Sequence, residues 1–157
     1  MNLKVSLLRE DAKPPRRAYS NDAGADVFFC PDPVTKNHCR MGEGTDFWVS
    51  PRTSCLLPTG IKMEIPDGHM LEVKNKSGIA SKRQLLVGAC VIDAGYDGEI
   101  FINLHNVGGT TQVIKSGDKI AQLVLVPIHT CGFDVVSGEL NENSDRGDGG
   151  FGSTGGR

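Results

Sequence analysis

The sequence lacks a long apolar run and a strong charge of either sign. No apolar stretch approaches the roughly 20 residues that cross a bilayer, and the opening run Met1–Arg9 is too short and too interrupted by Lys4 for a signal peptide. Seventeen Lys and Arg residues against nineteen Asp and Glu residues give a formal net charge of −2. This leaves no general basic field for DNA, RNA or an anionic membrane. We expect a soluble, cytoplasmic protein with no nucleic-acid and no membrane partner.

A paired cysteine motif is also missing. The cysteine count is odd and no CxxC pair occurs, which argues against a closed disulfide framework. His38 beside Cys39 is the only close Cys/His pair, and it lacks a second pair at zinc-finger spacing. We therefore expect free thiols and no structural zinc. The cysteines are Cys30, Cys39, Cys55, Cys90 and Cys131.

What the chain does contain is short strand-like runs separated by Gly, Pro and Asp turns. Alternation is clearest in Glu99–His105, where Ile100, Ile102 and Leu104 share one face. The 157 residues fit one domain, and one short helix is predicted near Ser77–Leu85. With no βαβ alternation, the pattern predicts an all-β fold of short antiparallel strands: a sandwich, a jelly roll or a distorted β-barrel. The predicted strands are Leu3–Leu8, Ala25–Cys30, Phe47–Val49, Ser54–Leu57, Ile61–Ile65, Met70–Val73, Glu99–Val107, Thr111–Ile114, Ile120–Ile128 and Phe133–Val136.

Glycine makes up half of the last twelve residues. Glycine leaves backbone N–H groups free to converge on phosphate oxygens. Ser153 and Thr154 add hydroxyl donors, Arg146 adds a planar charged fork, and Phe151 can cover a flat ring. The composition also fits a plain flexible linker. We predict a β domain over residues 1–136 and a flexible flap over residues 137–157 that closes over an anion.

The segment Val91–Ile100 places a carboxylate, Asp93, after an apolar strand and before a tight turn. A carboxylate in such a position can act as a general base for water, and Tyr96 offers a flat ring for a sugar or base. Asp93 alone also fits a turn-capping role, because Asp commonly hydrogen-bonds nearby backbone in turns.

Two further segments carry polar groups that suit phosphate. In Lys74–Ala80, Ser77 and Gly78 begin the predicted helix and Lys76 adds charge, although Ser77 also fits a simple N-cap. In Gly117–Leu123, the polar Gln122 stands among apolar residues, as either a sheet-edge residue or a ligand contact.

The order of these segments resembles the homotrimeric dUTPase family, whose five motifs are all present in order. The third and fifth motifs are the most specific. The five motifs are matched, in order, by Ala23–Val27, Lys76–Ala80, Ile92–Glu99, Gly117–Leu123 and Arg146–Gly155.

The resemblance implies a jelly-roll subunit in a threefold trimer, with each active site built from all three chains. It implies hydrolysis of dUTP to dUMP and pyrophosphate, with Asp93 as the base that activates water. Tyr96 packs under the deoxyribose and leaves no space for a 2′-hydroxyl. Backbone groups of the hairpin before Asp93 read the uracil edge, at Gly88, Cys90 and Val91.

The resemblance also implies a magnesium ion held mainly by the triphosphate, with Asp26 contacting it through water. Phe151 stacks on uracil, and the rest of the tail motif closes on the terminal phosphates. The implied phosphate contacts are Lys76, Ser77, Gly78, Gln122, Arg146, Gly152, Ser153 and Thr154.

The sequence departs from the family pattern at three positions. Lys76 stands where the second motif usually has Arg, which replaces a bidentate fork with a point charge. Cys90 stands where glycine is common, which affects uracil recognition. Lys119 replaces a frequent Arg, a change that we expect to matter little. The segment Pro31–Asp46 also looks longer than the usual connection.

Two other hypotheses fit parts of the sequence. A dCTP deaminase of the same superfamily would use a related hairpin, but the tail and the Ile92–Tyr96 segment favour the dUTPase interpretation. A binding or regulatory protein would keep the nucleotide pocket and signal through Pro31–Asp46. A P-loop nucleotidase is excluded because no Gly-x-x-x-x-Gly-Lys-Ser/Thr motif occurs.

Overall fold

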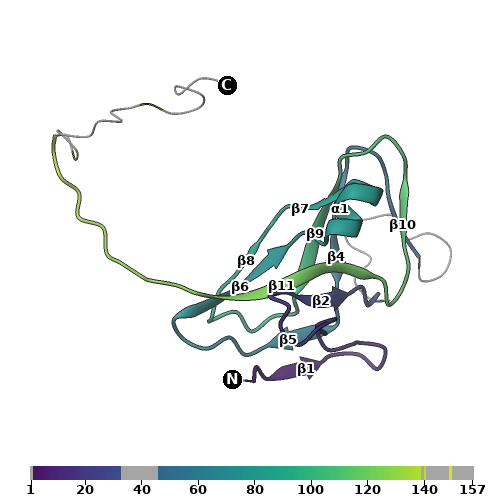
Figure 1. The fold of residues 1–157 in the computed structure, drawn as a ribbon, viewed down its shortest axis with the longest axis horizontal. Helices are drawn as coiled ribbons and strands as arrows, with labels where there is room; N and C mark the ends of the chain where they lie inside the picture. The colour runs from purple at the N-terminus through teal and green to yellow at the C-terminus, as the bar shows by residue number, and fades with distance from the viewer. Residues whose placement is uncertain (1, 33–45, 139, 141–148, 150–157) are drawn as a thin grey trace.

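The computed structural model describes residues 2–32, 46–138, 140 and 149, and within them the fold is all-β with one short helix (Figure 1). The strands form four antiparallel sheets and no closed barrel among the described residues. The predicted class is confirmed. The elements are β1 Val5–Leu7, β2 Ala25–Phe28, β3 Phe47–Val49, β4 Ser54–Pro58, β5 Ile61–Met63, β6 His69–Lys74, α1 Ser77–Arg83, β7 Leu85–Val87, β8 Val91–Ile92, β9 Phe101–Asn106, β10 Gln112–Ile114 and β11 Lys119–Pro127.

The largest sheet has the order β2-β11-β6-β8, and β11 is its longest strand. β11 pairs with β2 along one edge and with β6 along the other, so Gln122 lies opposite both Asp26 and Lys74. β8 pairs with the far edge of β6, where Ile92 opposes Leu71. Segments that are far apart in the sequence therefore meet on one sheet.

The core lies between this sheet and the sheet β4-β9-β7. Ile100, Ile102 and Leu104 are all fully buried, as the alternation predicts. Phe29 and Phe47 meet edge to face with ring centroids 5.8 Å apart, a favoured aromatic geometry. Burial of one face per strand fixes the register, since a slip by one residue would turn every apolar side chain outward.

Two strands of the structure are missing from the prediction, and one predicted strand is wrong. β8 is missed because two residues give no readable alternation. β7 is missed because its first residue, Leu85, falls in the predicted helix. The strand predicted at Phe133–Val136 is wrong, because the chain after β11 has no strand partner there. Figure 1 shows this segment running away from the body of the molecule. A strand needs a ladder of hydrogen bonds, and this segment meets none among the residues that the structure describes.

Helix α1 ends two residues earlier than predicted. Gln84 takes a left-handed conformation, with φ 53° and ψ 37°, and its N–H bonds the carbonyl of Ile79. Such a left-handed cap closes a helix without glycine. Lys82 and Arg83 lie in the last turn, where they complement the helix dipole.

Cys30, Cys55, Cys90 and Cys131 form no disulfide bond; Cys39 lies outside the described residues. No helix in the described part is long and apolar enough to cross a membrane.

Gly60 is a test of backbone constraint, because it has a φ of +70° and a Cβ there would lie 2.7 Å from Ala12 Cβ. Gly68 has a similar φ of +72° but open space around it. We predict that Gly68→Ala costs about 1–2 kcal/mol, the penalty of the left-handed region, and that Gly60→Ala costs clearly more. The measurement is denaturant unfolding of both variants, and equal losses would contradict the steric argument.

Candidate active site

A buried carboxylate joins three segments of the chain at one end of the large sheet. Lys76 Nζ donates to Asp26 Oδ1 at 2.8 Å, and Lys119 Nζ lies 2.7 Å from Asp26 Oδ2. The Asp26 side chain is only 7% exposed, whereas both lysines reach solvent. One carboxylate and two ammonium groups leave this lysine–aspartate cluster with a net charge of +1. Such a cluster suits an anionic ligand.

The charges of the cluster set the protonation of Asp26. Burial raises the pKa of Asp26, but hydrogen bonds from Lys119 and Lys76 and their charges outweigh burial, so the pKa lies below its ordinary value. Asp26 is therefore ionised at neutral pH and holds both ammonium groups in place.

A β-bulge brings Lys119 to this cluster. The register of β11 on β2 shifts between Lys119 and Ala121, so that Lys119 opposes Phe28. Without the shift, Lys119 would oppose Phe29 and lie on the other face of the sheet. With it, Lys119 shares the face of Asp26, because alternate residues of a strand point the same way.

Gln122 lies beside the cluster on β11, which is an inner strand of the sheet. It is not a sheet-edge residue, since β11 is paired on both sides. Its Nε2 donates to the Asn75 carbonyl at 2.9 Å. A Cβ on Gly24 would lie 2.3 Å from Gln122 Oε1, so glycine is required for this side chain to fit. Gln122 is held in one orientation at the cluster.

The start of α1 lies next to Gln122, because Asn75, whose carbonyl accepts from Gln122, directly precedes the helix N-cap. The helix N-cap is Lys76, and no side chain caps the helix, so Ser77 does not play the N-cap role. Ser77 and Gly78 are exposed, and a Cβ on Gly78 would meet nothing within 4 Å. The first N–H groups of a helix have no partner within the helix. Ser77, Gly78 and Lys76 are therefore open to a ligand.

The hairpin that precedes Asp93 is held at both ends by backbone bonds. Val73 N–H donates to the Cys90 carbonyl at 2.8 Å, and Gly88 N–H donates to the Asn103 carbonyl at 2.9 Å. Cys90 and Val91 are exposed at the tip. The Cys90 carbonyl is used by Val73, and the remaining backbone groups of these two exposed residues are available to a flat polar ring edge.

Gly88 lies under two polar side chains of β9. A Cβ there would lie 2.1 Å from Asn103 Oδ1 and 2.3 Å from His105 Nε2, and these two atoms are themselves 2.9 Å apart. Any side chain at Gly88 would displace this pair, which explains the glycine.

Asp93 and Tyr96 lie together at a cavity of about 200 Å³, which Val91, Ile100 and Phe101 also line. Both side chains are exposed, and Tyr96 N–H donates to the Asp93 carbonyl at 3.1 Å. The Asp93 carboxylate is therefore accessible to water and to a ligand in this cavity.

The single chain does not bring Asp93 to the lysine–aspartate cluster. Ile92 opposes Leu71 on β6, whereas Gln122 opposes Lys74, and three strand residues span about 10 Å. β8 and β6 are antiparallel. Asp93, which follows Ile92, and Lys76, which follows Lys74, therefore lie in opposite directions along the sheet. No hydrogen bond or ion pair in the described part joins the two groups.

Several predicted site residues lie outside the described residues. These are Arg146, Phe151, Gly152, Ser153 and Thr154. No group of three or more His, Cys, Asp or Glu side chains that could hold a metal ion occurs in the described part.

Four residues make contacts at these groups that the sequence did not predict, and one of them is Lys119, whose change from Arg was expected to matter little. Lys119 contacts Asp26, Asn75 links Gln122 to Val87 N–H, and Asn103 and His105 cover Gly88. Asn75 and Lys119 stand inside the quoted motifs, so only their geometry was missing. Nothing in the sequence around Asn103 and His105 indicates their contact with Gly88, because the pattern of one strand does not show which residues of another segment lie against it.

Asp26→Asn tests the lysine–aspartate cluster. We predict a loss of about 1–3 kcal/mol in the free energy of unfolding at pH 7, the value of hydrogen bonds to a charged group. Because the folded pKa of Asp26 is lowered, this stabilisation is complete above the unfolded pKa of about 3.9 and is lost as pH falls through the folded pKa.

The measurement is denaturant unfolding of both proteins between pH 7 and pH 2. Glu64→Gln is the control, because it removes only the exposed ion pair with Lys4 and such pairs contribute little. A difference between wild type and Asp26→Asn that grows as pH falls below 4 would contradict the assignment.

Comparison with known proteins relates this geometry to a family. The dUTPase family model matches residues 43–155. The deoxyuridine 5'-triphosphate nucleotidohydrolase of Clostridium tetani is 39% identical over 155 residues, which cover 98% of this chain and 96% of that protein. The enzyme of the same name from Desulfotalea psychrophila is 40% identical over 142 residues, which cover 88% of this chain and 85% of that protein.

Solved structures agree. A variant of the Staphylococcus bacteriophage 80alpha dUTPase with dUpNHpp has a TM-score of 0.81 and 28% identity, with 98% of each chain covered. A variant dUTPase from phage phi11 of S. aureus, which reveals the coordination of a structural Mg(II) ion, has a TM-score of 0.73 and 29% identity, with 90% of this chain and 99% of that chain covered. The chain belongs to the dUTPase family.

Proposed function

We propose that this protein hydrolyses dUTP to dUMP and pyrophosphate, which keeps uracil out of DNA and supplies dUMP for thymidylate synthesis. The observation that carries the proposal is the placing of Asp93 and Tyr96 together at one cavity, in a chain that belongs to the dUTPase family. The described free thiols fit the reducing conditions of the cytoplasm, where we place the reaction.

Asp93 is the general base. Its exposed carboxylate accepts a proton from a water molecule as the water oxygen bonds to the α-phosphorus. The bond from that phosphorus to the bridging oxygen breaks, and pyrophosphate leaves in line with the attack. The products are dUMP and pyrophosphate, and Asp93 then returns its proton to solvent.

The hairpin and Tyr96 select the nucleoside. The Tyr96 ring packs against the deoxyribose and leaves no room for a 2′-hydroxyl. The exposed backbone at Gly88, Cys90 and Val91 reads the uracil edge by hydrogen bonds. Two backbone bonds hold the hairpin, and a preformed reading edge discriminates better than a loose one.

The lysine–aspartate cluster and its neighbours bind the phosphates. Lys76 supplies charge, Ser77 and Gly78 supply N–H and hydroxyl donors, and Gln122 supplies an amide fixed against Asn75. The net positive charge of the cluster opposes the developing negative charge on the phosphate chain. The local charge matters because the chain as a whole is slightly acidic.

Magnesium fits this site only as an ion held by the substrate. Each Asp26 oxygen already accepts one lysine ammonium, and a carboxylate oxygen has room for one more donor. Asp26 can therefore bond a water of the hydration shell, with the triphosphate oxygens as the direct ligands. When bound, Mg²⁺ neutralises charge on those oxygens.

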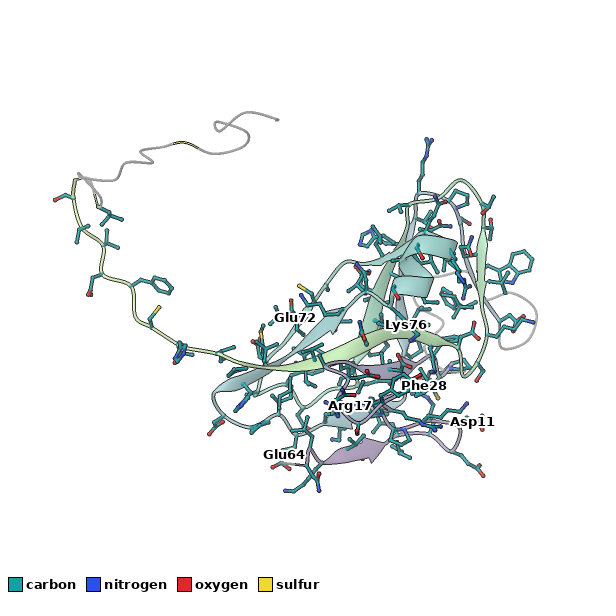
Figure 2. All side chains as sticks on the ribbon, viewed as in Figure 1. Asp11, Arg17, Phe28, Glu64, Glu72 and Lys76 are labelled. Atoms are coloured by element: carbon teal, nitrogen blue, oxygen red, sulfur yellow. The ribbon has the colours of Figure 1, made fainter. Side chains whose placement is uncertain are left out.

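The complete site needs more than one subunit, and we infer a homotrimer with shared active sites. The distance between Asp93 and the lysine–aspartate cluster within one chain supports this, since a triphosphate must contact both. The segment after β11 also supports it. Phe133 is 91% exposed and Val135 is completely exposed, and Figure 2 shows the side chains of this segment standing clear of the body. Apolar side chains in such a position favour packing on another chain.

The tail over residues 137–157 acts as a flap. Phe151 stacks on uracil, while Arg146, Gly152, Ser153 and Thr154 close on the terminal phosphates. A closed flap excludes all water except the nucleophile, and its opening limits turnover.

Asp93→Asn tests the proposed base. We predict that turnover falls by roughly 10²–10⁴, the usual loss when a general base is removed, because the amide keeps the shape but accepts no proton. The measurement is pyrophosphate release from dUTP, with dTTP, dCTP and UTP as poor substrates. Wild-type turnover in the variant would remove Asp93 from the mechanism, and ammonia release from dCTP would favour a deaminase instead.

Truncation before Arg146 tests the flap. We predict that most dUTP hydrolysis is lost while the trimer still forms, because the β domain and the segment after β11 are retained. Sedimentation analysis gives the assembly state and pyrophosphate release gives the activity. Unchanged turnover in the shortened protein would refute the role of the flap.

A further inference from the structure

Tyr96 is held by its own loop. Its hydroxyl donates to the Glu99 carbonyl at 2.8 Å, and its N–H donates to the Asp93 carbonyl. A Cβ on Gly98 would lie 2.4 Å from the Tyr96 hydroxyl oxygen, so the ring folds back over Gly98. The Tyr96 side chain is nevertheless about half exposed, at 47%. Backbone contacts therefore fix the ring, and packing does not.

The Glu99 carbonyl, which accepts from the Tyr96 hydroxyl, is held in place by the side chain of Glu99. Glu99 accepts from both terminal nitrogens of Arg9, at 2.9 Å from Nη1 and closer from Nη2. Glu99 Oε1 also accepts from Gly60 N–H at 2.7 Å. The two side chains are only 19% and 13% exposed. This bidentate pair is the strong kind of charge-assisted hydrogen bond.

The pair links segments that are 90 residues apart in the sequence. Arg9 Nη2 donates in addition to the Cys30 carbonyl at 3.0 Å, and Ile100 N–H donates to the Ile61 carbonyl at 2.9 Å. Glu99 thus stands where the chain after β1, the turn before β5 and the start of β9 meet. The Glu99 hydrogen bond raises the pKa of Arg9, so the guanidinium stays charged in this partly buried place.

The ion pair between Lys62 and Asp97 does not have this character. Lys62 Nζ lies 3.0 Å from Asp97 in the same loop, but the Asp97 side chain is 92% exposed. Exposed ion pairs contribute little to the free energy of folding and do little to fix the position of a loop. Removing Glu99, by contrast, leaves the partly buried Arg9 with Asp32, 3.9 Å from Nη1, as its ionic partner.

We propose that Arg9 and Glu99 are positioning residues for sugar selection: their ion pair fixes the Glu99 carbonyl, which holds the Tyr96 ring where a 2′-hydroxyl would lie. The inference rests on the proposed function, in which Tyr96 packs against deoxyribose. Neither residue touches the substrate. A ring free to tilt admits ribose, so loss of the pair lowers discrimination between dUTP and UTP more than it lowers dUTP turnover.

The experiment measures kcat and KM for dUTP and for UTP in wild type, Glu99→Gln and Tyr96→Phe. Glu99→Gln keeps the shape and the bond from Gly60 but loses the charge. Tyr96→Phe keeps the ion pair and loses only the hydroxyl. Each is expected to lower the ratio of kcat/KM for dUTP to that for UTP by about three- to tenfold, the effect of one hydrogen bond. The shift comes mainly from better use of UTP.

The double variant decides between positioning and mere stabilisation. If the pair acts only through the Tyr96 hydroxyl, the double variant has the ratio of Tyr96→Phe alone, because no hydroxyl is left for the pair to hold. Asp97→Asn is the matched control in the same loop and keeps the wild-type ratio. A wild-type ratio in folded Glu99→Gln overturns the proposal, and so do losses that multiply in the double variant.

Tyr96→Phe keeps the proposal testable even where Glu99→Gln does not fold, because an unchanged ratio in Tyr96→Phe also overturns it. The proposed function fails differently: wild type would then release no pyrophosphate from dUTP. A failure of the inference alone leaves a wild type that selects dUTP over UTP.

Discussion

The pairing of β11 with β2 on one side and β6 on the other is the constraint on which the site depends. It sets Gln122 opposite Asp26 and Lys74, and its single bulge turns Lys119 toward Asp26. The same ladder carries β6, whose far edge holds β8 and so the base of the Asp93 hairpin. One strand register therefore sets both halves of the site, although their chemistry comes from separate parts of the sequence.

The lysine–aspartate cluster gives a physical meaning to two departures from the family pattern. Lys76 and Lys119 both replace arginine, and both contact the same carboxylate. A lysine cannot make the bidentate fork of arginine, yet two ammonium groups on separate oxygens neutralise Asp26 and leave one positive charge over. The pair is a coupled arrangement around one carboxylate, which a comparison of single positions does not reveal.

The sequence predicted what depends on local chemistry and missed what depends on contact. β9 was readable because Ile100, Ile102 and Leu104 bury one face. The helix start and the turns followed from Gly, Pro and Asp. β8 was unreadable at two residues, and the strand predicted at Phe133–Val136 has no partner among the residues that the structure describes. The site residues came from motif resemblance, whereas the role of Asn75 as a link between Gln122 and the hairpin needed coordinates.

The uncovered segment after β11 has a consequence for how the protein responds to dilution. Phe133, Val135 and Leu140 leave large apolar surfaces in water in a lone chain, and covering them stabilises only the associated state. Any protein whose folded form gains stability from its own copies becomes less stable as its concentration falls. In the proposed trimer, each subunit acts toward the others as a stabilising ligand, so dilution lowers both the assembled fraction and the stability of the fold.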